Sequence, residues 1–132
     1  MKTVLKTILV ILILSSCSNK GQELLGVWNA DSKFYSATYK VYKDGGKLKA
    51  MALYYDDGTT HYKYIKGKNN KMYLFENLKP KGNVYVDAVS GATKKATPEQ
   101  LTIKVLDQDT LAVTSYIMHK PLTEKWFRKN NK

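Results

Sequence analysis

The strongest constraint on the fold is a series of turn signals that divides the chain into short segments. Glycines accept the positive φ angles that tight hairpins demand, and aspartate side chains bond to the backbone amides of turns. The segments between the turns lack a helical period and the length of a globular helix. The chain is therefore predicted to be all-β and built from hairpins. The turn signals are Asp44-Gly45-Gly46, Asp56-Asp57-Gly58, Gly67-Lys68-Asn69-Asn70, Pro80-Lys81-Gly82 and Asp107-Gln108-Asp109.

Alternation of apolar and polar residues supports strands between these turns. In the clearest case, Leu101, Ile103 and Val105 point to one face of a strand and the residues between them to the other. Closing such a meander into a barrel removes its two unpaired edges. We expect a small antiparallel up-and-down barrel of about eight or nine strands, its interior partly or wholly filled by side chains, with a β-sandwich as the alternative. The predicted strands are 24–30, 36–43, 47–55, 60–66, 71–76, 83–89, 101–106, 110–118 and 122–129.

Residues 1–17 form a separate segment. Lys2 and Lys6 form a short positive region that precedes an apolar run, Thr7–Leu14. This run is shorter than the roughly 20 apolar residues that span a bilayer. A charged start, a short apolar core and small residues are typical of a secretory signal peptide. The end of the segment, Leu14-Ser15-Ser16-Cys17, resembles the lipobox of bacterial lipoproteins. The resemblance implies cleavage before Cys17 and a diacylglycerol thioether on that cysteine.

Cys17 is also the only cysteine in the sequence. A lone cysteine in an exported protein has no disulfide partner, and lipidation would account for it. We expect residues 1–16 to be a lipoprotein signal peptide, residues 17–23 a lipidated tether and residues 24–132 one barrel domain. Ser18 resembles the residue that permits sorting to the outer membrane, so the expected location is the bacterial cell envelope, anchored by lipid at the outer membrane.

The net charge bears on the partners. The sequence has 22 Lys and Arg residues against 11 Asp and Glu residues, a formal net charge of +11. Arg128 is its only arginine, whereas nucleic-acid recognition relies heavily on arginine. We therefore expect no nucleic-acid partner. A lysine-rich solvated surface suits a protein that is held close to anionic membrane lipid.

Two marks at opposite ends of the predicted domain resemble lipocalins. Gly26-Val27-Trp28 resembles the Gly-x-Trp signature that opens lipocalin-like domains, and Trp126-Phe127-Arg128 resembles their last strand. The resemblance implies that Arg128 packs over Trp28 in a cation–π contact that closes the barrel base. Gly26, Trp28 and Arg128 would then be structural residues. The two helices of full lipocalins are not indicated, so the chain is similar to short bacterial lipocalin-like lipoproteins, and a roomy cavity is not expected.

Ten tyrosines stand out for a chain of this length. Tyrosine favours strands and presents a flat apolar ring with one polar tip. Sheet propensity explains many of them, and a site lined by tyrosines for a sugar or an aromatic ligand is the sharper interpretation. Alternation does not tell which of them face inward. The candidate ligand-lining residues are Tyr39, Tyr54, Tyr62, Tyr64, Tyr73, Tyr85 and Tyr116.

A second motif resembles a cofactor site. The run from Asp87 to Thr93 reads DAVSGAT and resembles the D-x-x-S-G-A-T motif at which exported FMN-binding domains receive a covalent flavin. The resemblance implies a phosphoester between FMN and the Thr93 hydroxyl. The following residues, Lys94–Pro98, depart from the helix that ends that family's domain. The alternative is a small-residue turn in which Asp87 and Ser90 cap backbone amides.

No other chemistry is indicated. His61 and His119 are isolated, and the paired aspartates lie in predicted turns without calcium-loop spacing. We expect no metal site and no enzyme activity. The sequence predicts a membrane-anchored lipoprotein that binds a small hydrophobic or aromatic ligand or contacts envelope components. The alternatives are a filled structural barrel with an envelope protein partner, and an extracytoplasmic electron carrier with covalent FMN on Thr93; apart from that FMN, no cofactor is expected.

Overall fold

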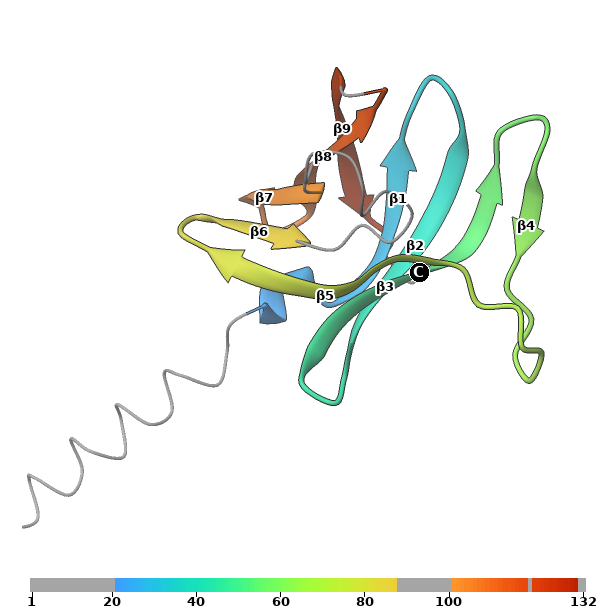
Figure 1. Cartoon of the computed structure of the whole chain (residues 1–132), viewed down its shortest axis with the longest axis horizontal. Coiled ribbons are helices and arrows are strands. Elements are labelled where there is room, and N and C mark those ends of the chain that lie inside the picture. The colour runs from blue at the N-terminus through green and yellow to red at the C-terminus, as the bar shows by residue number, and fades with distance from the viewer. Residues whose placement is uncertain (1–20, 88–100, 119, 131–132) are drawn as a thin grey trace, which may run out of the picture.

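The computed structural model describes residues 21–87, 101–118 and 120–130, so Cys17 and Thr93 lie outside it. The described residues form one antiparallel sheet preceded by a short 3-10 helix, η1 (Gln22–Leu24). No helix in these ranges is long and apolar enough to cross a bilayer. Figure 1 shows the strands β1 (Gly26–Asp31), β2 (Ser36–Asp44), β3 (Lys47–Asp56), β4 (His61–Lys63), β5 (Tyr73–Lys81), β6 (Val84–Asp87), β7 (Leu101–Asp107), β8 (Thr110–Ile117) and β9 (Lys120–Arg128).

The sheet closes on itself. Its strand order is β2-β1-β9-β8-β7-β6-β5-β3-β4, and β2 also pairs with β3. The eight strands other than β4 therefore form a barrel, while β4 extends the sheet from the second half of β3. The predicted all-β, up-and-down barrel is confirmed, and the alternative sandwich is not formed. Closure leaves no unpaired edge in the barrel wall, which is the physical reason why a meander of hairpins adopts it.

The antiparallel strands give the barrel two distinct ends. We call one end the base; it carries η1, the end of β9 and the β2–β3, β5–β6 and β7–β8 turns. The opposite end, the mouth, carries the β1–β2, β3–β4 and β8–β9 turns. In Figure 1, η1 lies next to β5 on the base side, where the described chain begins.

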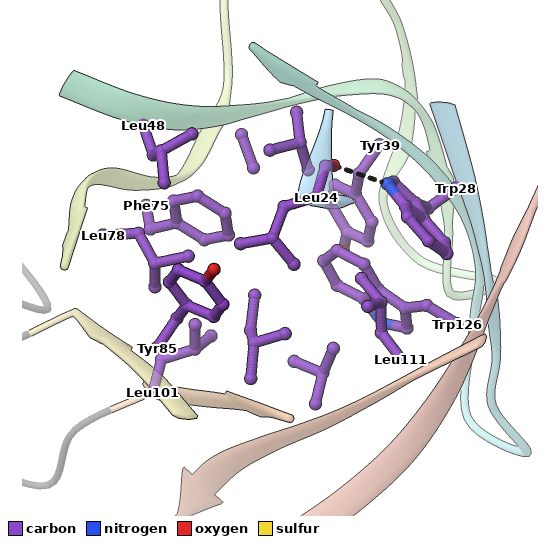
Figure 2. Close-up of a cluster of buried hydrophobic side chains, with 14 of the residues drawn as sticks. Leu24, Trp28, Tyr39, Leu48, Phe75, Leu78, Tyr85, Leu101, Leu111 and Trp126 are labelled. Atoms are coloured by element: carbon purple, nitrogen blue, oxygen red, sulfur yellow. Dashed lines mark hydrogen bonds between the residues drawn. The ribbon is translucent and has the colours of Figure 1, made fainter. Parts of the chain in front are cut away.

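Apolar side chains fill the lower part of the barrel. Leu24 points from η1 into the centre of the interior, between Phe75 and the stacked rings of Tyr39 and Trp126 (Figure 2). Leu24 is fully buried, and so is Trp28 beside it. The 3-10 turn therefore acts as a plug, because it carries an apolar side chain into the base of the barrel.

The base is closed by an arginine over a tryptophan. The guanidinium carbon of Arg128 lies 4.2 Å from the centre of the Trp28 ring. Arg128 also donates hydrogen bonds to the carbonyl oxygens of Leu25 at 2.8 Å and Glu23 at 2.9 Å. Gly26 has φ +131°, and a Cβ built there would lie 2.8 Å from Arg128 Nη1. Glycine is thus required at this position both for its backbone conformation and for the passage of the guanidinium.

Several element boundaries differ from the sequence prediction, and β4 (His61–Lys63) is shorter than the predicted strand 60–66. Leu24 ends η1 instead of beginning the first strand, since its amide bonds to the Gly21 carbonyl at 3.1 Å. Pro80 lies within β5 and pairs with Tyr85, so the turn comes later than the Pro80-Lys81-Gly82 motif indicates. Proline and glycine signals mark that a turn is near, and strand pairing decides where it begins.

Candidate functional site

A pocket of about 310 Å³ lies near the mouth, between β2, β3 and β5. Asp57 and Thr60 of the β3–β4 turn contribute polar groups to it. The volume is at the lower end of the range for small-molecule sites, which are mostly apolar walls with a few placed polar groups. The other lining residues are Tyr39, Ala52, Tyr55, Met72, Tyr73 and Leu74.

A bulge between β2 and β3 brings two aromatic residues to the same interior face. Tyr39 pairs with Ala52, but the next pair along is Thr38 with Tyr54, so one residue of β3 is extra. Strict alternation from Ala52 would point Tyr54 inward. The extra residue instead sends Tyr55 inward and leaves Tyr54 42% exposed. The bulge is therefore what makes Tyr55 a wall of the pocket.

Two ring stacks stand beside this pocket. Tyr39 stacks on Trp126 with ring centres 4.7 Å apart and an angle of 15° between the rings. Tyr35 stacks on Tyr55 with ring centres 5.3 Å apart. Since Tyr39 and Tyr55 also line the pocket, the stacks connect its wall to the interior side of β9.

A buried carboxylate lies behind the stacks. Glu124 of β9 is only 9% exposed, and the Tyr35 hydroxyl donates a hydrogen bond to its Oε2 atom. Its other oxygen, Oε1, is buried and has no hydrogen-bond partner among the described residues. The same holds for Nε1 of Trp126, which is buried one inward position further along β9. An unpaired buried polar atom costs about 1–3 kcal/mol, so the free protein bears this cost for one acceptor, on Glu124, and one donor, on Trp126.

Burial controls the ionisation of the two tyrosines nearest to Glu124. Burial, and then the hydrogen bond to Glu124, raise the pKa of Tyr35 far above its usual range. Burial also raises the pKa of Tyr39. Both phenols therefore stay neutral at ordinary pH, and Tyr35 keeps the proton that it donates to Glu124.

The raised pKa of Tyr35 predicts a dependence of stability on alkaline pH. The unfolded phenol ionises near pH 10, below the folded pKa, so its contribution is fully present below pH 10 and is lost as pH rises further. We expect the free energy of unfolding of Tyr35→Phe to fall less steeply than that of the wild type between about pH 9 and pH 11. Urea denaturation at several pH values in this range measures the slope of the free energy of unfolding against pH. Tyr116→Phe, which changes an exposed tyrosine, is the control. Equal slopes in Tyr35→Phe and wild type would contradict the assignment.

The seven tyrosines chosen from the sequence do not form one site. Tyr39 and Tyr73 line the pocket. Tyr85 is buried at the base, where its hydroxyl donates to Glu23 Oε1 at 2.7 Å, and Tyr62 donates to the Asn70 carbonyl at 2.7 Å. The others lie outside the pocket, with Tyr116 40% exposed; they are Tyr54, Tyr64 and Tyr116.

Sequence reasoning missed four residues of this region: Tyr35, Tyr55, Glu124 and Trp126. For Glu124 a signal was present, because Leu122, Glu124 and Trp126 alternate on one face of the last strand. An acidic residue between two apolar inward positions is an exception to burial rules and marks a special site. For Tyr55 there was no local signal, because the bulge that turns it inward depends on the partner strand.

Comparison with protein-family models, curated proteins and solved structures finds no match to this chain. The barrel itself agrees with the lipocalin-like resemblance at the level of architecture. The lipobox at Cys17 and residues 88–93 of the flavin-type motif lie outside the described residues, and only Asp87 of that motif is described, at the end of β6. Both motifs stay predictions. Within the described ranges, no group of three or more His, Cys, Asp or Glu side chains is placed to hold a metal ion.

Proposed function

We propose that this chain is a lipid-anchored protein of the bacterial cell envelope, at the outer membrane, that binds a small amphipathic molecule at the mouth of its barrel. The observation that carries the proposal is an aromatic pocket whose wall residues stack on Trp126 and on Tyr35, the residue that bonds to Glu124. Glu124 Oε1 and Trp126 Nε1 are buried behind these stacks without a hydrogen-bond partner among the described residues. Buried polar atoms in folded proteins are normally paired. A ligand that pairs both atoms would remove a free-energy cost that the free protein bears.

The chemistry of the site limits the ligand. Glu124 Oε1 accepts a hydrogen bond and Trp126 Nε1 donates one, so the polar end of the ligand needs both a donor and an acceptor. The walls formed by Tyr39, Tyr55 and Tyr73 suit a flat or aromatic body, which stacks well on such rings. Leu24 fills the barrel below and excludes a long acyl chain. The best match is a small, flat molecule with one hydrogen-bonding end.

Replacement of Glu124 tests the proposal. Glu124→Gln keeps the size of the side chain but removes its charge, and a hydrogen bond to a charged group contributes about 1.5–3 kcal/mol. We expect the small molecule that is extracted from purified Glu124→Gln to be reduced at least about tenfold relative to wild type. The measurement is mass spectrometry of the denatured extract. Glu76→Gln, an exposed glutamate of β5, is the matched control.

If Glu124→Gln and Glu76→Gln retain equal amounts of the same molecule, the ligand lies elsewhere and the proposed site is wrong. Membrane anchorage is tested separately, because it does not depend on the mouth. The intact mass of the mature protein, purified from its membrane, should show acyl mass on Cys17. A mature chain without that mass would contradict a lipid anchor on that residue.

A protein partner is the second candidate, and exposed apolar side chains at the mouth favour it. Phe34 in the β1–β2 turn is 69% exposed, and Met118 in the β8–β9 turn is 90% exposed. Large exposed apolar side chains at one end of a molecule suit contact with another protein. Chemical cross-linking in intact cells tests this role, since Phe34→Ser with Met118→Ser should abolish a specific cross-linked product. Covalent FMN on Thr93 stays a prediction, and it would make the protein yellow.

A further inference from the structure

We infer that the base of the barrel is a docking surface for an anionic membrane, so that the mouth faces away from the bilayer. Exposed lysines gather at this end, in or beside the β2–β3 and β5–β6 hairpins and after β9. None of them forms an ion pair with another described residue. We call them the base lysines: Lys43, Lys47, Lys79, Lys81 and Lys129.

Four acidic residues of the described chain lie at the base, and two of them form ion pairs. Asp44 pairs with Lys49, with Nζ and Oδ2 3.1 Å apart. Asp109 pairs with Arg128 at 3.3 Å. Glu23 accepts the hydrogen bond of Tyr85. Asp107 accepts the hydrogen bond of the Asp109 amide at 2.8 Å, and neither it nor Glu23 forms an ion pair with another described residue. The five base lysines outnumber these two carboxylates, and an anionic surface is the partner that complements the excess.

The mouth has a different charge. Three aspartates, Asp31, Asp56 and Asp57, lie at the ends of β1 and β3 and in the turn after β3. The exposed lysines described on this side are Lys33 and Lys120 in or beside the mouth turns, Lys63 at the end of β4, and Lys125, the strand partner of Asp31. In the described part of the barrel, aspartates and lysines are therefore mixed at the mouth, whereas lysines outnumber unpaired carboxylates at the base. An anionic plane would orient the domain with its base inward.

The place where the described chain begins agrees with this orientation. Gly21 lies at the base: its amide bonds to the Tyr85 hydroxyl at 3.2 Å, and it packs on Leu48. Three residues lie between it and Cys17, so the four steps along the chain span at most about 14 Å when fully extended. The screening length at physiological salt is about 8 Å. Lipid on Cys17 would therefore keep Gly21, and with it the base, within about two screening lengths of the headgroups.

The anchor is part of the proposed function, but the docking surface is tested without assuming it. The membrane-purified full-length mature protein is reconstituted into phosphatidylcholine vesicles with and without phosphatidylglycerol, and its lysines are acetylated under limiting reagent. Mass spectrometry then gives the labelling rate of each lysine. We expect the base lysines to be labelled several-fold more slowly when phosphatidylglycerol is present. Lys33, Lys63, Lys68 and Lys120 serve as internal references whose rates should not change.

Variants give the second readout. A lysine near an anionic surface strengthens binding roughly fivefold, so a variant with Lys43, Lys47, Lys79 and Lys81 all changed to Gln should bind phosphatidylglycerol vesicles at least about tenfold more weakly. This comparison uses the mature chain with Cys17→Ser, which removes any lipid. The matched control has the same charge change away from the base, at Lys33, Lys63, Lys68 and Lys120, and should lose much less binding.

Equal loss in the two variants, or equal protection of all lysines, would overturn the inference, because net charge and not the base would then attract the membrane. Failure of the proposed function looks different. If Cys17 carries no lipid, the intact mass shows it, while the lysine comparison still stands. If no ligand binds at the mouth, the vesicle results are unaffected.

Discussion

Trp28→Ala is expected to lower the free energy of unfolding by about 3–5 kcal/mol, the usual loss for a large buried aromatic side chain. Trp28 is fully buried, and its Nε1 donates to the Leu24 carbonyl at 2.9 Å (Figure 2). Its removal leaves a cavity at the base and frees the plug residue Leu24. It also removes the ring on which Arg128 rests.

Urea denaturation followed by circular dichroism measures this loss. Phe127→Ala is the control, because Phe127 is also an aromatic residue near the base but is 43% exposed on the outer face. We expect its loss to be well below that of Trp28→Ala, on the order of 1 kcal/mol or less. Equal losses in the two variants would mean that Trp28 is not central to the core.

Arg128→Ala is expected to cost about 2–4 kcal/mol, because hydrogen bonds to charged groups contribute about 1.5–3 kcal/mol each when one partner is removed. The guanidinium bonds to the carbonyl oxygens of Glu23, Leu25 and Gln108. These carbonyls belong to η1, its exit and the β7–β8 turn, so a single side chain ties three segments of the base together.

Arg128→Lys distinguishes geometry from charge. A lysine ammonium is a point charge and does not reproduce the planar fork that reaches several carbonyls while it stacks on a ring. We expect Arg128→Lys to recover less than half of the stability lost in Arg128→Ala. Lys125→Ala, an exposed lysine on the same strand, should change stability by no more than about 0.5 kcal/mol. Full recovery by lysine would show that the hydrogen-bond fork is unimportant.

The strands could be predicted from the sequence because hairpin signals are local. Gly45 and Gly46 have φ values of +59° and +78°. Because glycine readily adopts positive φ, the residue types alone predict a turn at this position. Alternation likewise placed the strand around Ile103, which is fully buried. Closure into a barrel could also be predicted, because it removes the two unpaired edges of the sheet. The contact of Arg128 with Trp28, which the lipocalin resemblance implies, is present at the base.

The site was less predictable because it depends on partners far apart in the sequence. The inward turn of Tyr55 comes from a bulge opposite Tyr39, and without that bulge Tyr54 would take the inward position. The plug formed by Leu24 needs the whole barrel around it, so an isolated segment gives no sign of it. Glu124 could have been suspected from its inward register, whereas its bond with Tyr35 joins residues 89 positions apart.

The most direct test of ligand binding at the mouth is the intact mass of the protein purified from its own membrane, recorded under native and then denaturing conditions. We expect acyl mass on Cys17 in both spectra and a second, small mass that is present only in the native spectrum. A flavin mass that survives denaturation would instead assign the protein to electron transfer through Thr93. Identical masses in the native and denatured spectra would contradict a ligand-binding mouth. The remaining role would then be that of a filled barrel that contacts a protein partner.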